Sequence, residues 1–433
     1  MKRLLVVAAA AAFVLAVGGR AAADRGRFEV WAVDQSNTTG TSSGGTLYVY
    51  RGSTLAGQSA PSAPPERIDL GAATRALCET TTGTAPVRPH MLLFNERQSH
   101  AVLSFVASGH VAFFDAASRT PVACLDVGVQ AHAAVPAPDE SYVVVANQNG
   151  KLLQRITTDY GTGAFALDNA ATLDLATCTT PSGAPCQDPV LRPDNAPICP
   201  LIDSQSRLTF VTLRGGGLLV VDSRATPMRI VAEYDKATVH GNGCGGLETA
   251  GKMYVNSGGG TATNLSEFDV YAFRLSAFST TANPPNTPAP TVVVRQDDRE
   301  HADSHGVALT KHGPYLWVAD RSGNRIVVVD TKIDSAIGEF SLVGPLSADP
   351  SPDLLDVSPS GNRIFVSLRG ALPLSGDPHA STGSTPGVGV IRVEQGGRSG
   401  TLQAIERISN VDATGVDRSD PHGLRVRTFE SSD

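Results

Sequence analysis

Residues Asp303 to Gly344 carry the sequence DSHGVALTKHGPYLWVADRSGNRIVVVDTKIDSAIGEFSLVG, and this stretch decides the fold. Four short runs rich in Val, Ile, Leu and aromatic residues alternate there with turn signals such as Lys311 to Pro314 and Asp320 to Asn324. Gly and Asn accept the positive φ of tight turns and Pro fixes φ, so these breaks end strands rather than helices. The runs Tyr315 to Ala319 and Arg325 to Asp330 are too short for helices and too apolar for surface loops. The stretch therefore predicts a four-stranded antiparallel meander.

This meander recurs along the whole chain. A single copy would expose both of its apolar faces, whereas copies stacked face to face bury them, so a repeat of about 40 to 60 residues predicts a β-propeller. Helix patterns are nearly absent after the N-terminus. The second strand of each copy is expected at Val30 to Val33, Val102 to Ala107, Tyr142 to Ala146, Leu208 to Leu213, Met253 to Asn256, Tyr315 to Ala319 and Ile364 to Leu368. We expect an all-β chain, a seven-bladed β-propeller of four-stranded antiparallel blades.

The first copy lacks an inner strand, because its second strand follows directly on Phe28 and Glu29. A matching strand occurs at the other end of the chain, from Asp420 to Val426. We infer that the C-terminal strand joins the N-terminal blade and closes the ring, which removes free sheet edges. The propeller is expected to span residues 24–429, followed by a tail at 430–433. Two insertions, Asp159 to Pro200 and Ser276 to Pro290, are expected to form surface loops.

Residues Met1 to Ala23 have the pattern of a secretory signal peptide. Lys2 and Arg3 precede an apolar run that ends near Val17, and three alanines before Asp24 form a small-residue cleavage site. The run is too short to span a bilayer comfortably, and the cleavage site disfavours the alternative of a retained anchor. We expect a periplasmic or secreted protein whose mature chain is not inserted in a membrane.

Six cysteines and a modest charge limit the classes of function. The even number of cysteines in an exported chain allows three disulfides, and Cys178 with Cys186 is the expected pair, because they flank a Pro-Ser-Gly turn. No CxxC pair occurs, which disfavours thiol redox catalysis and a zinc ribbon. The net charge is −7 without a basic stripe, so nucleic acid is not an expected partner.

Three segments of the Asp303 unit resemble the YVTN-type repeats of bacterial seven-bladed propellers. These segments are Ser304 to Ala308, Leu316 to Asp320 and Ile326 to Asp330. Weaker copies occur at Asp139 to Asn147 and Ser358 to Val366. The resemblance implies the seven-bladed fold over nearly the whole mature chain, and a fold does not by itself specify an activity.

One position, at the start of each inner strand, is rich in histidine. Five of its seven occupants are histidines, out of ten in the chain, and the occupants are His422, His90, His132, Ile198, His240, His305 and Asp353. Because inner strands line the axis of a propeller, we expect these imidazoles to converge. Three or four convergent imidazoles suffice to bind Cu or Zn, so the pattern predicts a metal site. The alternatives are a histidine that merely starts each strand, with its ring bonded to nearby backbone, and a proton-transfer or anion-binding role.

Further polar residues are expected around the same mouth. His301 and Asp303 are candidates for an additional ligand or for second-layer contacts, as is Asp353. The turns after the second strands place Arg214, Asp320, Arg321 and Arg369 nearby, where guanidinium groups would suit a small anionic substrate. Turn solvation and ion pairs between blades are the alternative for each of them. His100, His110, His312 and His379 are expected at the surface.

No hydrolase, zincin, Walker or haem-attachment motif is present. By arrangement, the predicted site is similar to the copper-binding propellers of nitrous oxide reductase and thiocyanate dehydrogenase. This similarity implies a copper-dependent oxidoreductase that acts on a small anion, with zinc as the alternative metal. A second reading is a periplasmic zinc or copper carrier without catalysis. A third is a metal-free propeller that binds a ligand or a protein partner, or a lactonase-like hydrolase.

Overall fold

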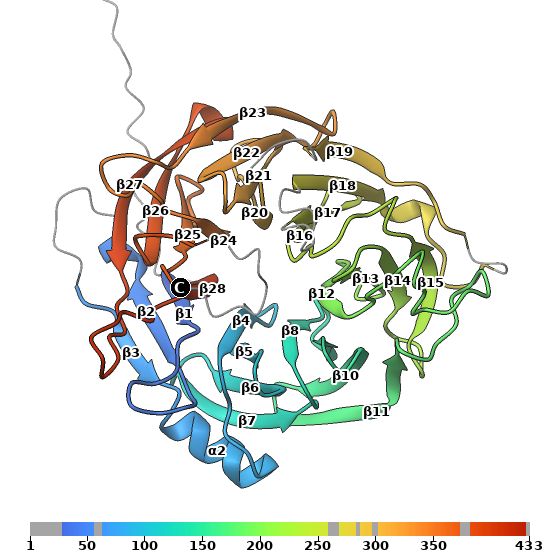
Figure 1. Ribbon diagram of the computed structural model, residues 1–433, viewed down its shortest axis with the longest axis horizontal. Helices are drawn as coiled ribbons and strands as arrows, with labels where there is room; N and C mark the ends of the chain where they lie inside the picture. Colours follow the sequence, from blue (N-terminus) through green and yellow to red (C-terminus); the bar gives the residue numbers. More distant parts are fainter. Residues whose placement is uncertain are drawn as a thin grey trace, which may run out of the picture.

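The computed structural model describes residues 28–55, 63–258, 268–282, 286–296, 302–372 and 382–429. In these ranges the strands form seven sheets of four antiparallel strands, arranged as blades around a central axis (Figure 1). The predicted all-β, seven-bladed propeller is therefore confirmed. The predicted signal peptide and the 430–433 tail lie outside the described residues.

Each blade runs from an inner strand at the axis to an outer strand at the rim (Figure 1). The inner strands are β4 (Pro89–Phe94), β8 (Ala131–Pro136), β12 (Pro197–Ile202), β16 (Gly246–Thr249), β20 (Ser304–Leu309), β24 (Pro352–Val357) and β28 (Pro421–Thr428). The second strands are β1 (Phe28–Asp34), β5 (His100–Phe105), β9 (Tyr142–Asn147), β13 (Leu208–Leu213), β17 (Lys252–Gly258), β21 (Tyr315–Asp320) and β25 (Arg363–Leu368). In six blades the inner strand directly precedes the second strand in the chain, whereas in the seventh the inner strand β28 comes from the other end of the chain and pairs with β1.

The third strands are β2 (Thr46–Arg51), β6 (His110–Asp115), β10 (Leu152–Asp159), β14 (Leu218–Asp222), β18 (Phe268–Arg274), β22 (Arg325–Asp330) and β26 (Gly387–Glu394). The outer strands are β3 (Glu66–Asp69), β7 (Thr120–Asp126), β11 (Ala164–Asp174), β15 (Arg229–Tyr234), β19 (Thr291–Arg295), β23 (Ser335–Ser341) and β27 (Ser399–Arg407). Short helices, α1 (Gly52–Leu55), η1 (Leu275–Ala277) and η2 (Gln395–Gly397), lie between strands.

The ring closes as predicted, because β28 pairs antiparallel with β1 and places Val426 opposite Val30. The core lies between the blades rather than inside one sheet. Successive side chains of a strand point to opposite faces, so Trp31 packs in a cluster with Leu103 of one neighbouring blade, while Val30 packs with Phe365 of the other. Every residue of β21 is buried, whereas the outer strand β23 is mostly exposed.

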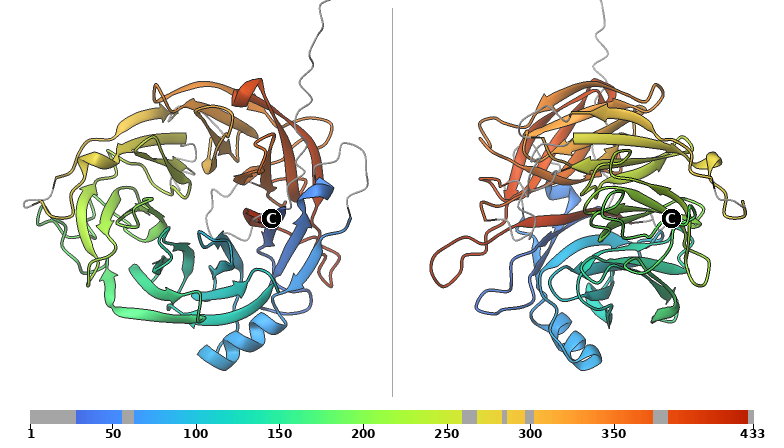
Figure 2. Two further views of the ribbon diagram at one scale, coloured as in Figure 1. Left: turned by 180° about the vertical axis from the view of Figure 1, so that it is seen from behind. Right: turned by 45° about the vertical axis from the view of Figure 1, so that its right-hand side comes forward.

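The rim carries a helix of ten residues, and one predicted surface loop contains a strand. Helix α2 (Ala73–Thr82) lies outside the ring of blades (Figure 2). Its last four residues, Glu79 to Thr82, include three threonines, which have a low helix propensity, so the sequence pattern did not indicate a helix there. A disulfide from Cys78 holds this helix against β7 through Cys124. The segment Asp159 to Pro200 is not simply a surface loop, because it contributes the outer strand β11 and buries Arg192.

The six cysteines form three disulfides. The predicted pair Cys178–Cys186 is confirmed, and the others are Cys78–Cys124 and Cys199–Cys244. Disulfides are typical of exported proteins. Within the described part of the chain, no helix has the length and apolar character needed to cross a membrane.

Candidate metal centre

A β-bulge at the start of the inner strands sets the position of the axial side chains. In β20 the bulge lies between Ser304 and Val307, and the same irregularity recurs in β4, β8, β12, β24 and β28. A bulge adds one residue on one strand and re-aims its side chain. The residue in the second position of these six strands is His90, His132, Ile198, His305, Asp353 or His422. The predicted alignment is correct for these six blades.

In the remaining blade the structure places Cys244, not His240, at this position. Gly246 pairs with Val255 just as Val307 pairs with Val318, so the residue two places earlier in β20, His305, corresponds to Cys244. His240 lies four residues before Cys244. Its Nδ1 is 2.5 Å from Oδ2 of the buried Asp269, which also accepts a hydrogen bond from the Tyr271 hydroxyl.

Glycine follows three of these residues because adjacent blades approach closely at the bulge. A Cβ atom on Gly245, Gly306 or Gly423 would lie 1.8, 2.1 or 2.5 Å from the carbonyl oxygen of the bulge residue in the neighbouring blade. A backbone oxygen cannot yield by that amount, so only glycine fits. The recurrent His-Gly pair is thus explained partly by packing.

Three carbonyl oxygens of axial residues accept hydrogen bonds from polar side chains of the preceding blade's second strand. The donors are Ser104 to His132, Asn256 to His305 and Ser367 to His422. The bulge frees these carbonyls from the strand ladder, and buried carbonyls require partners. These contacts hold the backbone of each axial residue in place.

Four of the five predicted histidines converge at the axis. The ring centroids of His90 and His422 are 4.0 Å apart and stacked, those of His90 and His132 are 4.6 Å apart, and those of His305 and His422 are 5.2 Å apart. His90, His305 and His422 are each no more than 4% exposed. The imidazoles form one cluster that draws on four different blades.

Hydrogen bonds fix the tautomer of two of these rings. The Gln35 side-chain NH₂ must face Asp420, since a carboxylate only accepts, so the Gln35 oxygen accepts a hydrogen bond from His90 Nδ1 at 2.7 Å. His422 Nδ1 donates to Asp353 Oδ2 at 2.7 Å. In both rings Nε2 is left with its lone pair. Such outer hydrogen bonds to a carboxylate or amide are typical of metal-binding histidines.

Five polar atoms of the cluster are buried and form no hydrogen bond among the described residues. They are Nε2 of His90, Nε2 of His422, both ring nitrogens of His305 and Oδ1 of Asp353, although this oxygen lies 3.1 Å from His305 Nε2. One ligand atom each from His305, Asp353 and His422 lies within 4.8 Å of the other two, a spacing that suits a metal ion. A buried polar atom without a partner costs about 1–3 kcal/mol, so these atoms favour a bound ion or water.

Asp353 is the centre of a charged network. Its Oδ2 accepts from Arg369 at 3.0 Å, and its Oδ1 lies 3.1 Å from His305 Nε2. Arg369 also makes two hydrogen bonds to Asp420, and Arg321 makes two to Asp303. With neutral histidines, two guanidinium groups and three carboxylates leave one net negative charge.

Burial favours the uncharged form of His90, His132 and His305. It lowers the pKa of His132 to about 3 and lowers the pKa values of His90 and His305 well below the ordinary value. The neighbouring His422 adds to the effect on the pKa of His90, and Arg321 adds to that on His305. Burial alone would raise the pKa of Asp353, but the surrounding His422, His305 and Arg369 hold it well below its usual range. His305 therefore offers a neutral imidazole and Asp353 an ionised carboxylate.

The other predicted site residues have different positions. Arg214, half-exposed, pairs with Asp194 at 2.6 Å, and Asp320, buried, pairs with Arg325 at 2.6 Å. His301 lies outside the described residues. The guanidinium groups of Arg321 and Arg369 belong to the network but are already engaged by carboxylates.

The expectation that His100 and His110 lie at the surface is wrong. Both are buried; His100 packs beside the Tyr160 ring and His110 Nε2 lies 2.9 Å from the Thr82 hydroxyl. His312 is exposed as expected, and His379 lies outside the described residues. Neither buried ring lies in the axial cluster of imidazoles.

Sequence reasoning missed Gln35 and Asp420. Gln35 follows β1 just as Arg321 follows β21, and each backbone N–H donates to the carbonyl of an aspartate, Asp420 or Asp303. Asp420 precedes His422 by two residues, as Asp303 precedes His305. This shared Asp-x-His-Gly pattern was the available signal.

The comparisons with solved structures support the fold alone. A protein from Lactobacillus plantarum aligns over 92% of this chain and 99% of its own, with a TM-score of 0.57 and 13% identity. The β-propeller domain of Swd1 from Myceliophteria thermophila aligns over 78% of this chain and 96% of its own, with a TM-score of 0.50 and 10% identity. No protein-family model matches the chain, and no curated protein matches its sequence. The fold and the axial cluster together define a seven-bladed propeller with candidate metal ligands at its axis.

Proposed function

We propose that this protein is an exported metal-binding propeller that holds a transition-metal ion at its axis on His305, His422 and Asp353, beside His90. The five buried atoms that form no hydrogen bond carry this proposal, because a cation satisfies imidazole lone pairs and a carboxylate oxygen at once. The three disulfides support export. In a metal-free scaffold, buried water would have to partner these atoms.

Copper is the first candidate and zinc the second, because imidazole is a good ligand for both. The network carries one negative charge, so a divalent ion makes the centre net positive. A positive centre would attract a small anion, which supports a copper-dependent oxidoreductase acting on such an anion. The network charge, rather than a free guanidinium, supplies the attraction.

Metal analysis of protein purified from the periplasm without an affinity tag tests the proposal. The double variant His305→Gln, His422→Gln should lose the ion, while the wild type and the control His312→Gln, changed at an exposed ring, should each hold about one ion per chain. Circular dichroism should show the same strand content in all three. Equal metal content in the double variant and the control would overturn the site.

The identity of the ion separates the finer alternatives. Copper that stays bound and changes oxidation state would support a redox enzyme, and zinc that exchanges freely would support a carrier. A wild type that holds no ion after incubation with Cu(II) or Zn(II) would overturn the metal-binding proposal and favour a ligand-binding scaffold.

A further inference from the structure

The disulfide between Cys199 and Cys244 differs from the other two in its position. Cys78–Cys124 fastens helix α2 to the rim, and Cys178–Cys186 closes a loop with a sequence separation of 8. Cys199, by contrast, lies in the bulge of β12, and Cys244 occupies the axial position of the next blade. This disulfide therefore lies among the residues that surround the axis.

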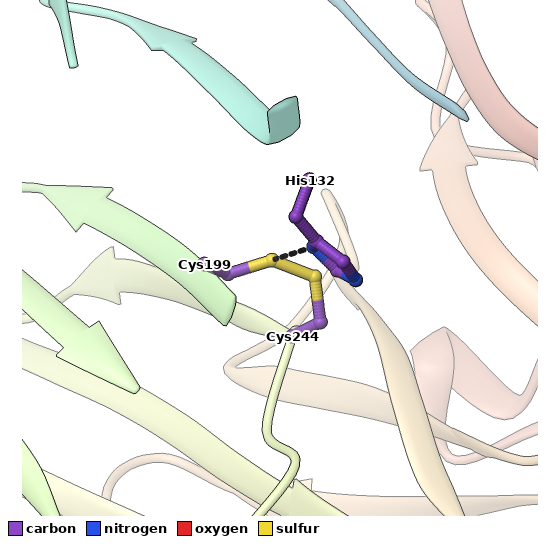
Figure 3. Close-up of side chains that lie close together, drawn as sticks. All are labelled: His132, Cys199 and Cys244. Carbon is purple, nitrogen blue, oxygen red and sulfur yellow. Dashed lines mark hydrogen bonds between the residues drawn. A yellow bond between two sulfur atoms is a disulfide. The ribbon is translucent and has the colours of Figure 1, made fainter. Parts of the chain in front are cut away.

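A third donor lies beside this disulfide. Figure 3 shows the His132 ring next to the two sulfur atoms, with Nδ1 4.0 Å from Cys199 Sγ. One ligand atom of each of His132, Cys199 and Cys244 lies within 4.8 Å of the others. Around a tetrahedral ion with metal–sulfur bonds near 2.3 Å, neighbouring donors are separated by about 3.8 Å. The imidazole is thus already at a suitable distance, and only the two sulfurs would have to separate.

The disulfide is surrounded by apolar side chains, one of which is the thioether of Met91. Both cysteines line an axial cavity of about 320 Å³ together with Met91, Leu247 and Leu354. Met91 also packs with both cysteines in one buried cluster. The cavity gives the sulfurs room to rotate apart and gives a small reagent access to them. Thiolate and thioether donors select soft ions such as Cu(I).

From this geometry we propose a second, latent metal site: reduction of Cys199–Cys244 creates a site for one Cu(I) ion, bound by the two thiolates and His132. A dithiol supplies the two electrons and two protons that convert the disulfide into two thiols, and is itself oxidised to its cyclic disulfide. Binding of Cu(I) then displaces the two thiol protons, and the ion keeps its oxidation state. Its three ligands differ from those of the site on His305, His422 and Asp353.

Stoichiometry with Cu(I) tests the proposal. The protein is reduced anaerobically with a dithiol, freed of reductant and titrated with Cu(I) presented as its bicinchoninate complex. The background His305→Gln, His422→Gln isolates the latent site from the proposed first one. Its matched control additionally carries Cys199→Ser and Cys244→Ser and keeps the other four cysteines.

Reduction should add about one more Cu(I) per chain in the background variant than in the control, whose four other cysteines are shared by both proteins. A further His132→Gln change should weaken Cu(I) binding at least about tenfold, the scale of a lost or disturbed ligand contact. Unchanged affinity would overturn the role of His132. If reduction adds no Cu(I), or adds equal amounts in both proteins, the disulfide is only a staple between blades and the proposal fails.

A measurement without cysteine variants guards against misfolding. Wild-type protein, reduced and loaded with Cu(I), is alkylated and its peptides are weighed. Cu(I) should protect Cys199 and Cys244 from alkylation but not Cys178 or Cys186. Equal alkylation of all cysteines would overturn the site, even where the first site retains its ion.

Discussion

At the scale of the residue, the orientation of two axial histidines is set by hydrogen bonds from their Nδ1 atoms. Gln35 and Asp353 each hold the Nδ1 proton of a ring, His90 and His422, and so direct the Nε2 lone pairs of both toward the cluster. Arg369 in turn fixes Asp353 and Asp420, which orients Gln35. One chain of hydrogen bonds therefore orients the rings of His90 and His422, and leaves their Nε2 atoms for an electron-pair acceptor such as a metal ion.

A pH dependence of stability follows from the buried rings. In the unfolded chain a histidine binds a proton below about pH 6.5, whereas folded His132 has a pKa of about 3 and the pKa values of His90 and His305 are also lowered. The unfolded state then binds more protons, so stability is complete above about pH 6.5 and falls as the pH decreases toward 3. Each such ring contributes a slope of about 1.4 kcal/mol per pH unit.

Urea unfolding of metal-free protein at several pH values between 7 and 4.5 measures this slope. His132→Gln should lower the slope of unfolding free energy against pH by the contribution of about one proton. The exposed control His312→Gln should leave the slope unchanged. Parallel profiles for His132→Gln and the wild type would contradict the assignment of a buried neutral ring.

At the scale of the element, the inner strand combines a bulge with a glycine. The bulge aims one side chain at the axis, and the glycine after it lets the next blade approach. The two requirements act at adjacent residues, so the spacing of the blades and the geometry of the axial cluster depend on each other.

Gly306→Ala should show this dependence. Its Cβ would lie 2.1 Å from the Asp353 carbonyl oxygen, so the blade must shift, at a cost of about 1–3 kcal/mol in the free energy of unfolding. The shift displaces Asp353, so metal content should fall as well. Gly338→Ala is the matched control, because nothing lies within 4 Å of its added Cβ. Denaturation midpoints that agree for the two variants would disprove the steric argument.

At the scale of the whole molecule, closure of the ring is a pairing between the two ends of the chain. Strand β28 covers the edge of β1 and carries His422 to the axis beside His305. Leu424 and Val426 of the same strand pack with Phe365 of the neighbouring blade. The last strand therefore contributes to stability and to the site together.

Removal of residues 421–433 should abolish cooperative folding. The edge of β1 would lose its partner and offer unpaired backbone groups to other chains, so aggregation should follow. Removal of residues 430–433 alone is the control and should leave the melting temperature unchanged. Size-exclusion chromatography and thermal unfolding distinguish the outcomes, and a monomeric, cooperatively unfolding protein without β28 would contradict the closure argument.

The sequence by itself determined the blade repeat, the closing strand and four of the converging histidines. Each of these is encoded in contiguous residues, as apolar runs of fixed length between Gly, Asn and Pro turns. The fifth histidine was misplaced because His240-Gly241 and Cys244-Gly245 present the same local pattern, a ligand followed by glycine. Only the pairing of Gly246 with Val255 shows which of them lies at the bulge.

Only the tertiary structure decided which groups meet at the axis. The contact of Gln35 with Asp420 joins the two ends of the chain within one blade, and the contacts of Arg369 with Asp420 and of Cys199 with Cys244 join neighbouring blades. No local pattern specifies such partners, because the fold, not the neighbouring sequence, brings them together. The sequence therefore predicts a histidine ring, whereas the structure shows which nitrogens are held and which are left for a ligand.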